Sequence, residues 1–240
     1  MSTAPKSLEV PRKRWNPYTV VVWNAAFFLL FIVIALLLMR KWGSPEPWSA
    51  VDKNAIAIVA LSVVYCTQQL ILYPSIFRTR ESMNLFIGKH FDARMPGYLG
   101  ILGAIELLAF ADYAHWNLVP GLRNPIVQMA GLGVMFGGLV WMLYVDRYLS
   151  THFLQAWEEH KLMLEGPYRW LRHPRYGALL LSRLGFALAI GSVIAYCVLV
   201  GWFVVVWIRM EREEKYLLGE FGDQYVEFMK TRVRLVPGVY

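Results

Sequence analysis

Long apolar runs, separated by short charged segments, are the dominant pattern of the chain. Four of these runs are close to the ~20 residues that a helix needs to cross the ~30 Å hydrocarbon core of a bilayer. They are residues 19–39, 54–73, 97–114 and 125–145. The pattern therefore predicts four helical membrane spans in the first part of the chain.

A fifth apolar run, residues 178–208, has a different length. As one helix it would be about 46 Å long, which exceeds a single span unless the helix were steeply tilted. Gly191 and Ser192 lie near the middle of the run and offer a place to turn. We therefore expect a hairpin of two helices, 178–190 and 193–208, and about six transmembrane helices in all.

The distribution of Lys and Arg supports this count, because cytoplasmic loops of membrane proteins carry the excess of positive charge. With six spans and a cytoplasmic N-terminus, nineteen Lys and Arg residues lie inside and four lie outside, namely Arg40, Lys41, Lys53 and Arg123. A single span at 178–208 would place the basic loop before it and the basic tail after it on opposite sides. The bias predicts an integral, multi-pass membrane protein with cytoplasmic N- and C-termini. The same bias is expected in an inner membrane and in the endoplasmic reticulum, so it does not distinguish the two.

The composition agrees with a membrane protein, since 57% of the residues are hydrophobic and 17% are charged, against about 25% charged in soluble domains. The net charge of +7 does not indicate nucleic acid, because the basic residues are spread between apolar runs, as suits anionic lipid headgroups. Cys66 and Cys197 have no Cys or His at a metal-ligand spacing, so we expect no disulfide framework and no metal site. Because the sequence contains no internal repeat and no long linker, we expect a single all-α membrane domain that covers residues 1–240.

Two polar segments carry the residues that could perform chemistry. One is 146–175, which follows the fourth span, and the other is the tail that begins at Arg209. Both face the cytoplasm in this topology. Within the tail, Arg209 and Glu213 are four residues apart and share one face of a helix. Basic residues beside a span are usually anchors that reach the headgroups, so charge alone does not identify a site.

The order of residues in these segments is more specific than their charge. It reads HKLMLEGPYRWLRHPRYG from residue 160 and RMEREEKYLLGEFGDQYVEFMKTRVRLVP from residue 209. These stretches contain H-x-L, G-x-Y and R-H-P-x-Y, then R-x-x-x-E-E, F-G-x-x-Y and a closing basic residue and proline. In this pattern the chain, from His160 to Pro237, resembles the isoprenylcysteine carboxyl methyltransferase and phospholipid methyltransferase family of integral membrane enzymes. One position departs from it, since Ala178 stands where the family usually has glycine, and Gly177 comes one place early.

The resemblance implies a cytoplasmic pocket for S-adenosylmethionine, and hence a catalytic region at 146–240 behind the four spans of 1–145. The ammonium of this cofactor needs an anion and its carboxylate needs a cation or hydrogen-bond donors, roles that Glu213 and His173 could fill. Arg209 matches the residue that the family assigns to the acceptor, and we expect it to be catalytic. The family's cofactor contacts fall on His160, Lys161, Leu162, Met163, Tyr168, His173, Pro174, Arg175, Tyr176 and Glu213.

The implied reaction transfers the sulfonium methyl group to a lipophilic acceptor that approaches from the membrane lipids, between the helices. The carboxylate of an isoprenylcysteine-like or prenylated acceptor would need no strong base, and Arg209 could hold it with two hydrogen bonds. A phospholipid amine and a small thiol stay open as acceptors, although the sequence shows no compelling base for either.

Two other functions share part of this pattern. Membrane sterol-type reductases carry a similar R-H-P-x-Y stretch but bind NADPH, and the Glu213-Glu214 pair favours the methyltransferase. A membrane scaffold without catalysis could keep the same fold, but the presence of both His173 and Glu213 argues against it.

Glu106 and Arg183 lie within predicted spans, where ionisable residues are costly and either pair or line a cavity. Both fall in the middle or the cytoplasmic half of their helices. We expect their side chains to contact each other, as a structural pair or as part of the acceptor site.

Overall fold

The computed structural model of the chain describes residues 17–40, 56–64 and 95–235. The predicted all-α class is confirmed, because every regular element in these ranges is helical and the isolated β-bridge joins only Leu171 to Val233. Residues 56–64 form a helix. The other elements are α1 (Pro17–Met39), α4 (Met95–Ala111), η1 (Asp112–Trp116), η2 (Pro120–Leu122), α5 (Pro125–Glu158), η3 (Gly166–Arg169), α6 (Pro174–Ile190), α7 (Val193–Phe221) and α8 (Asp223–Thr231).

The apolar runs agree with the helices that the structure describes. α1 ends at Met39 and α5 begins at Pro125, as predicted, and α4 covers most of the third run. The second run is helical at 56–64, and its last residues lie outside the described ranges. Within those ranges two helices are long and apolar enough to cross a membrane, Pro125–Phe153 and Val193–Phe221.

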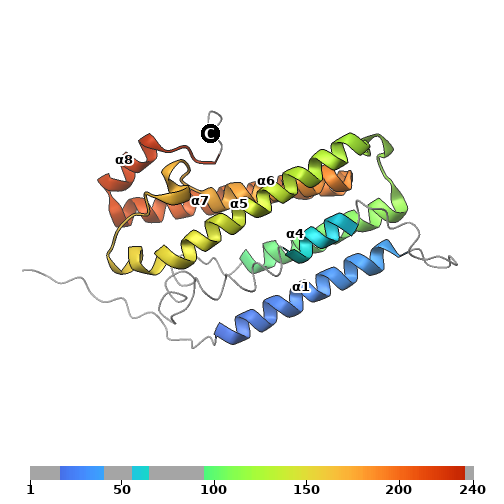
Figure 1. Ribbon diagram of the computed structural model, residues 1–240, viewed down its shortest axis with the longest axis horizontal. Helices are drawn as coiled ribbons and strands as arrows, with labels where there is room; N and C mark the ends of the chain where they lie inside the picture. Colours follow the sequence, from blue (N-terminus) through green and yellow to red (C-terminus); the bar gives the residue numbers. More distant parts are fainter. Residues whose placement is uncertain (1–16, 41–55, 65–94, 236–240) are drawn as a thin grey trace, which may run out of the picture.

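The helices labelled α1 and α4 to α7 run in two opposite directions (Figure 1). α1, α4 and α6 run one way, and α5 and α7 run the other way. α6 packs against both α5 and α7, and α4 covers α7 and lies next to α1. The N-terminus of α6 and the C-termini of α5 and α7 therefore meet at the same end of the molecule.

α5 and α6 approach each other so closely that their backbones touch. A Cβ on Gly138 would lie 2.6 Å from the backbone nitrogen of Ser182, and one on Gly185 would lie 2.1 Å from that of Met135. Gly131, nearer the N-terminus of α5, makes a third contact of this kind with Leu188 and Ala189. Helices in lipid associate by close packing, for which small residues at the interface are required. These glycines therefore set the position of α6 along α5.

The chain reverses between α6 and α7 within two residues. Gly191 has a positive φ of 59° and donates its N–H to the carbonyl of Ala187, 3.0 Å away. Ser192 then caps α7, because its hydroxyl oxygen accepts the N–H of Ile194 at 3.2 Å. The left-handed backbone conformation favours glycine, so the sequence Gly-Ser places the turn here.

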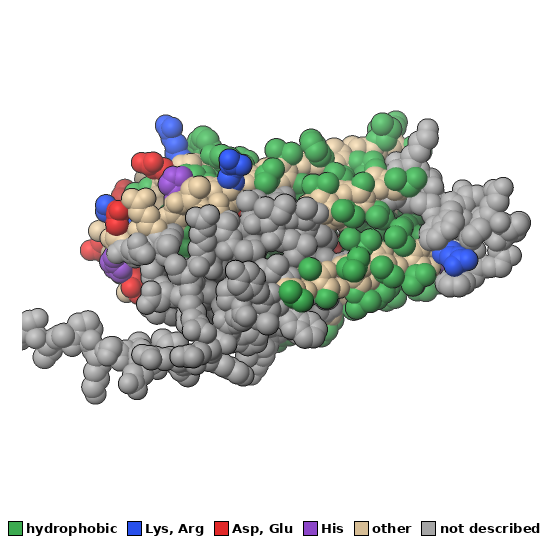
Figure 2. Space-filling view, turned by 60° about the horizontal axis from the view of Figure 1, so that its bottom comes forward, with side chains coloured by type: hydrophobic (Ala, Val, Ile, Leu, Met, Phe, Trp, Pro, Cys, Tyr) green, Lys and Arg blue, Asp and Glu red, His purple; other side chains and the backbone are tan. Residues whose placement is uncertain are grey.

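α5 and α7 continue well past the ends of their apolar parts. The predicted boundaries, residues 145 and 208, mark where the chain becomes polar, whereas the helices run on to Glu158 and Phe221. A helix satisfies its own backbone hydrogen bonds and can leave an apolar environment without ending. Figure 2 shows most of the charged side chains in view at this end, with hydrophobic side chains over the rest of the visible described surface.

The predicted contact between Glu106 and Arg183 is confirmed. Arg183 Nη1 of α6 donates to Glu106 Oε1 of α4, and the Arg183 guanidinium lies 4.8 Å from the ring centroid of Trp202 on α7. Only 2% of Glu106 is exposed. The pair joins three helices, and each charge compensates the other in a site shielded from water.

Gly138→Ala should lower the stability of the protein by about 1–3 kcal/mol, because the added methyl group overlaps the α6 backbone. Thermal unfolding in detergent measures the change. Gly137→Ala is the matched control, since nothing lies within 4 Å of a Cβ there, and it should be neutral or stabilising by up to about 1 kcal/mol. Equal effects of the two changes would contradict the backbone contact.

Candidate active site

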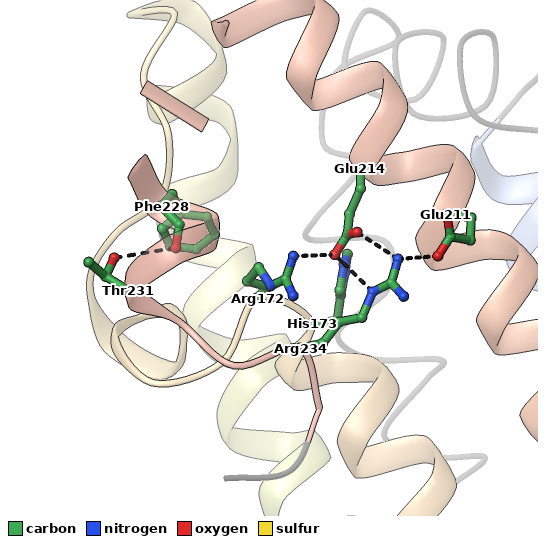
Figure 3. Close-up of polar contacts among 7 residues, drawn as sticks. All are labelled: Arg172, His173, Glu211, Glu214, Phe228, Thr231 and Arg234. Carbon is green, nitrogen blue, oxygen red and sulfur yellow. Dashed lines mark hydrogen bonds and ion pairs between the residues drawn. The ribbon is translucent and has the colours of Figure 1, made fainter. Parts of the chain in front are cut away.

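The charged end of the molecule brings together the start of α6, the polar turns of α7 and the C-terminal residues 232–235 (Figure 3). Pro174 begins α6, a position that suits proline because the first helical N–H has no partner in the helix. The backbone before it is held by the C-terminal segment: Arg172 N donates to Val233 O at 2.8 Å and His173 N to Arg234 O at 3.2 Å. The R-H-P turn is therefore fixed against residues from the end of the chain.

Glu214 on α7 is the centre of this site. Its Oε1 accepts hydrogen bonds from His173 Nε2 and Arg234 Nε, both at 3.0 Å, and forms an ion pair with Arg172 Nη1 at 3.0 Å. Its Oε2 accepts from Arg234 Nη2 at 2.6 Å, and the same nitrogen reaches Glu211 at 2.6 Å. His173 and Arg234 are almost fully buried, with side-chain exposures of 2% and 4%. Glu214 thus ties α7 to two segments that are far from it in sequence.

The cations around Glu214 keep it ionised. Glu214 lies beyond Ile208, the last residue of the apolar part of α7. Burial by itself raises the pKa of the carboxyl group, but the hydrogen bonds from His173 and Arg234 outweigh it and hold the pKa at about 2. Burial likewise lowers the pKa of Arg234, and Glu214 and Glu211 more than reverse this, so that its pKa is raised. Glu214 and Arg234 are therefore both charged near neutral pH.

A second cluster surrounds Glu213, the neighbouring residue on α7. The Tyr176 hydroxyl donates to Glu213 Oε2 at 2.9 Å, and the Arg209 guanidinium lies 5.5 Å from the Tyr176 ring centroid. Tyr168 lies near Glu213. Its pKa is raised mainly by burial and, to a smaller extent, by the negative charge of Glu213. Tyr168 therefore keeps its phenolic proton and can donate a hydrogen bond.

α5 supports the site from the opposite side. Arg175 Nε donates to the buried Asp146 at 2.8 Å, and Trp141 Nε1 donates to the carbonyl of Pro174 at 3.2 Å. Gly166 has a φ of 59°, and a Cβ there would lie 2.4 Å from the Tyr148 ring. These contacts hold the start of α6 and the loop before it against α5.

His160 lies at the far end of the polar part of α7. The His160 ring stacks on Phe221 at 4.9 Å, and its Nδ1 is 3.7 Å from Glu220 Oε1. Lys161 pairs with Glu159 at 2.7 Å on the surface, and Leu162 and Met163 are half-buried. Seven residues of helix separate Glu213 from Glu220, which corresponds to about 10 Å.

The structure thus divides the residues predicted for the site into two groups. One group lies together and comprises His173, Pro174, Arg175, Tyr176, Arg209 and Glu213, with Tyr168 beside them. The other is His160, which lies against Phe221 near the end of α7, with Lys161, Leu162 and Met163 following it in the chain.

The sequence did not indicate the partner of His173. His173 and Glu213 were both expected to contact the cofactor, with no protein partner named for His173, and the structure places His173 against Glu214. Arg172, Glu211 and Asp146 were not predicted to take part either. Two signals were available in the sequence. They are Glu214, the second glutamate of R-x-x-x-E-E, and Arg234, the closing basic residue of the whole pattern. Both belong to the pattern, and neither had been given a role.

Comparison with known proteins locates the same region. Residues 125–224 match a family model described as phospholipid methyltransferase. A Protein-S-isoprenylcysteine O-methyltransferase of Dictyostelium discoideum is 26% identical over 56% of this chain and 60% of its own length. Another from Xenopus laevis is 34% identical over 55% and 51%, and a third, form B of Arabidopsis thaliana, is 37% identical over 37% and 47%.

The chain spans 60% or less of the length of each of these three relatives. The family match covers α5, α6, most of α7 and the residues between them, and it contains His173, Tyr176, Arg209, Glu213 and Glu214. The part of the chain that carries these residues is therefore similar to the phospholipid methyltransferase family and to enzymes named Protein-S-isoprenylcysteine O-methyltransferase.

Proposed function

We propose that this protein is a membrane methyltransferase that uses S-adenosylmethionine to methylate the carboxylate of an isoprenylcysteine-like acceptor. The observation that carries the proposal is the cluster of Tyr176, Arg209 and Glu213 beside the His173–Glu214 pair. It lies at the charged end of apolar helices, in the region that matches enzymes named Protein-S-isoprenylcysteine O-methyltransferase. A water-soluble cofactor and a lipid-soluble acceptor could both reach this cluster.

The arrangement of the helices supports six spans with the charged end in the cytoplasm. α1 and α4 run in the same direction, so the chain must cross back between them, and the helix at 56–64 lies in that interval. α6 and α7 would then form a membrane hairpin over 178–208. In this proposal residues 1–240 are one membrane domain, with four spans up to residue 145 and a catalytic region from 146, and both termini are cytoplasmic.

The residues at the charged end fit S-adenosylmethionine. Glu213 is a half-buried carboxylate whose hydrogen-bond donor among the described residues is the Tyr176 hydroxyl, so it can accept further bonds from an ammonium group. The Arg172 guanidinium, which pairs with Glu214 through Nη1, has further N–H groups that can donate to the carboxylate of the cofactor. Leu162, Met163 and the tyrosine rings offer apolar walls for adenine, and about 10 Å along α7 would separate the two ends of the ligand.

The bound cofactor would supply a methyl group that is already activated on sulfonium sulfur. The contribution of the protein is then alignment and exclusion of water. Arg209 can hold an acceptor carboxylate with two hydrogen bonds and point one oxygen at the methyl group. The raised pKa of Tyr168 keeps its hydroxyl protonated, so Tyr168 does not accept a proton near neutral pH. This favours a carboxylate acceptor over an amine or a thiol, which must lose a proton.

The decisive experiment offers labelled S-adenosylmethionine with a farnesylcysteine analogue, phosphatidylethanolamine or a small thiol. We expect a base-labile methyl ester on the farnesylcysteine analogue and no label on the other two. Label on the amine or thiol would change the acceptor class. Protection against heat by NADPH and not by S-adenosylmethionine would instead favour the reductase and reject the proposal.

Glu213→Gln should weaken binding of S-adenosylmethionine about tenfold or more, since a charged hydrogen bond to the ammonium is lost. Calorimetry on the purified protein measures the affinity. Tyr176→Phe removes the hydroxyl donor but keeps the carboxylate, and should have the smaller effect. Glu227→Gln, at an exposed carboxylate on α8, is the control and should change nothing. Unchanged affinity in Glu213→Gln would refute this role.

Arg209→Ala should lower kcat/KM for the acceptor about 100-fold while changing cofactor affinity less than twofold, because the guanidinium acts on the acceptor. Steady-state kinetics with each substrate varied in turn separates the two effects. Arg212→Ala, on the exposed side of the same helix, should keep near-normal kinetics. A loss of cofactor affinity in Arg209→Ala would move Arg209 to the cofactor side of the site.

A further inference from the structure

We propose that Arg234 is a positioning residue of this site: through the Glu214 carboxylate it sets the orientation and the tautomer of the His173 ring. The inference rests on the proposed function in so far as His173 serves a cofactor. It concerns the C-terminal segment 232–235, which also holds the R-H-P turn and helps to keep Glu214 ionised.

The geometry of the carboxylate is the first step. Arg234 binds both oxygens of Glu214, with Nε on Oε1 at 3.0 Å and Nη2 on Oε2 at 2.6 Å (Figure 3). A two-bond contact between a planar guanidinium and a planar carboxylate fixes the plane of the carboxylate. His173 Nε2 binds Oε1, one of the same two oxygens, at 3.0 Å. Whatever orients the Glu214 carboxylate therefore also orients the hydrogen bond of His173.

Arg234 is itself held rigidly enough to act in this way. Its side chain is 4% exposed, and its guanidinium lies 5.0 Å from the ring centroid of Trp207. Its carbonyl oxygen accepts the N–H of His173, so that backbone and side chain of Arg234 both act on the same residue. Leu235, the next residue, packs into a buried cluster with Met210 of α7. Arg234 is thus fixed to α7 and to the R-H-P turn at once.

The tautomer follows from the chemistry of the carboxylate. An ionised carboxylate only accepts hydrogen bonds, so the His173 Nε2 that faces Glu214 carries the hydrogen. Nδ1 is then the ring nitrogen left for a ligand. Without Arg234 the carboxylate keeps its ion pair with Arg172 and can turn toward it. The His173 ring would lose its fixed partner and adopt both tautomers.

The test compares Arg234→Ala and Arg234→Lys with the wild-type protein. Lys230→Ala is the matched control, because it removes a cation four residues away that contacts the exposed Glu227. Calorimetry measures the Kd for S-adenosylmethionine, and nitrogen NMR of protein labelled in its five histidines reports the tautomer, with His173→Gln to assign the signal. We expect Arg234→Ala to raise the Kd about tenfold and Arg234→Lys, which keeps one bond, about threefold.

In both Arg234 variants the single Nε2–H signal of His173 should become a mixture, whereas Lys230→Ala should leave signal and Kd unchanged. If the Kd and the His173 signal stay at wild-type values in Arg234→Ala, the proposal is wrong. Should Arg234→Ala fail to fold, Arg234→Lys decides by the same two readouts. If the wild-type protein binds no S-adenosylmethionine, the proposed function fails, and the NMR signal alone still decides whether Arg234 sets the tautomer.

Discussion

The close approach of α5 and α6 is the contact on which the rest of the described structure depends. Two helices in lipid gain little from burying apolar surface against each other, because the lipid is equally apolar. Their association requires direct packing, and Gly138 and Gly185 permit it because glycine has no side chain that would hold the two backbones apart. This packing fixes the register that sets Arg175 against Asp146. A slip by one turn would move the partners apart by about 5 Å and break that bond.

With this register, the N-terminus of α6 and the C-termini of α5 and α7 lie at the same end of the molecule, and the site forms there. α6 begins at Pro174, while α5 and α7 continue beyond their apolar parts into polar surroundings. Charged side chains can gather there without the cost they would have in hydrocarbon. They are nevertheless buried by one another, and removing one partner of such a group leaves an uncompensated charge. Arg172, Glu214 and Arg234 therefore hold their three segments together as a unit.

Several features of the structure could be predicted because short stretches of the sequence determine them. The ends of the apolar runs, the turn at Gly191 and Ser192, and the shared helix face of Arg209 and Glu213 each depend on residues close in sequence. The contact of Glu106 with Arg183 was also predictable, since an ionisable side chain at membrane depth needs a partner and these two were available. The lengths of α5 and α7 were not, because the polarity that ends a span does not end a helix.

The sequence by itself determined the helical class, the apolar segments, the charge bias and the ordered motif in which the chain resembles membrane methyltransferases. Only the tertiary structure decided that His173 meets Glu214 and Tyr176 meets Glu213. Neighbouring residues on a helix point about 100° apart, so the rotation of α7 against α6 selects the partner. That rotation is set by packing between residues far apart in sequence, and no local pattern records it. For the same reason the role of Arg234 became visible only once the end of the chain lay beside the R-H-P turn.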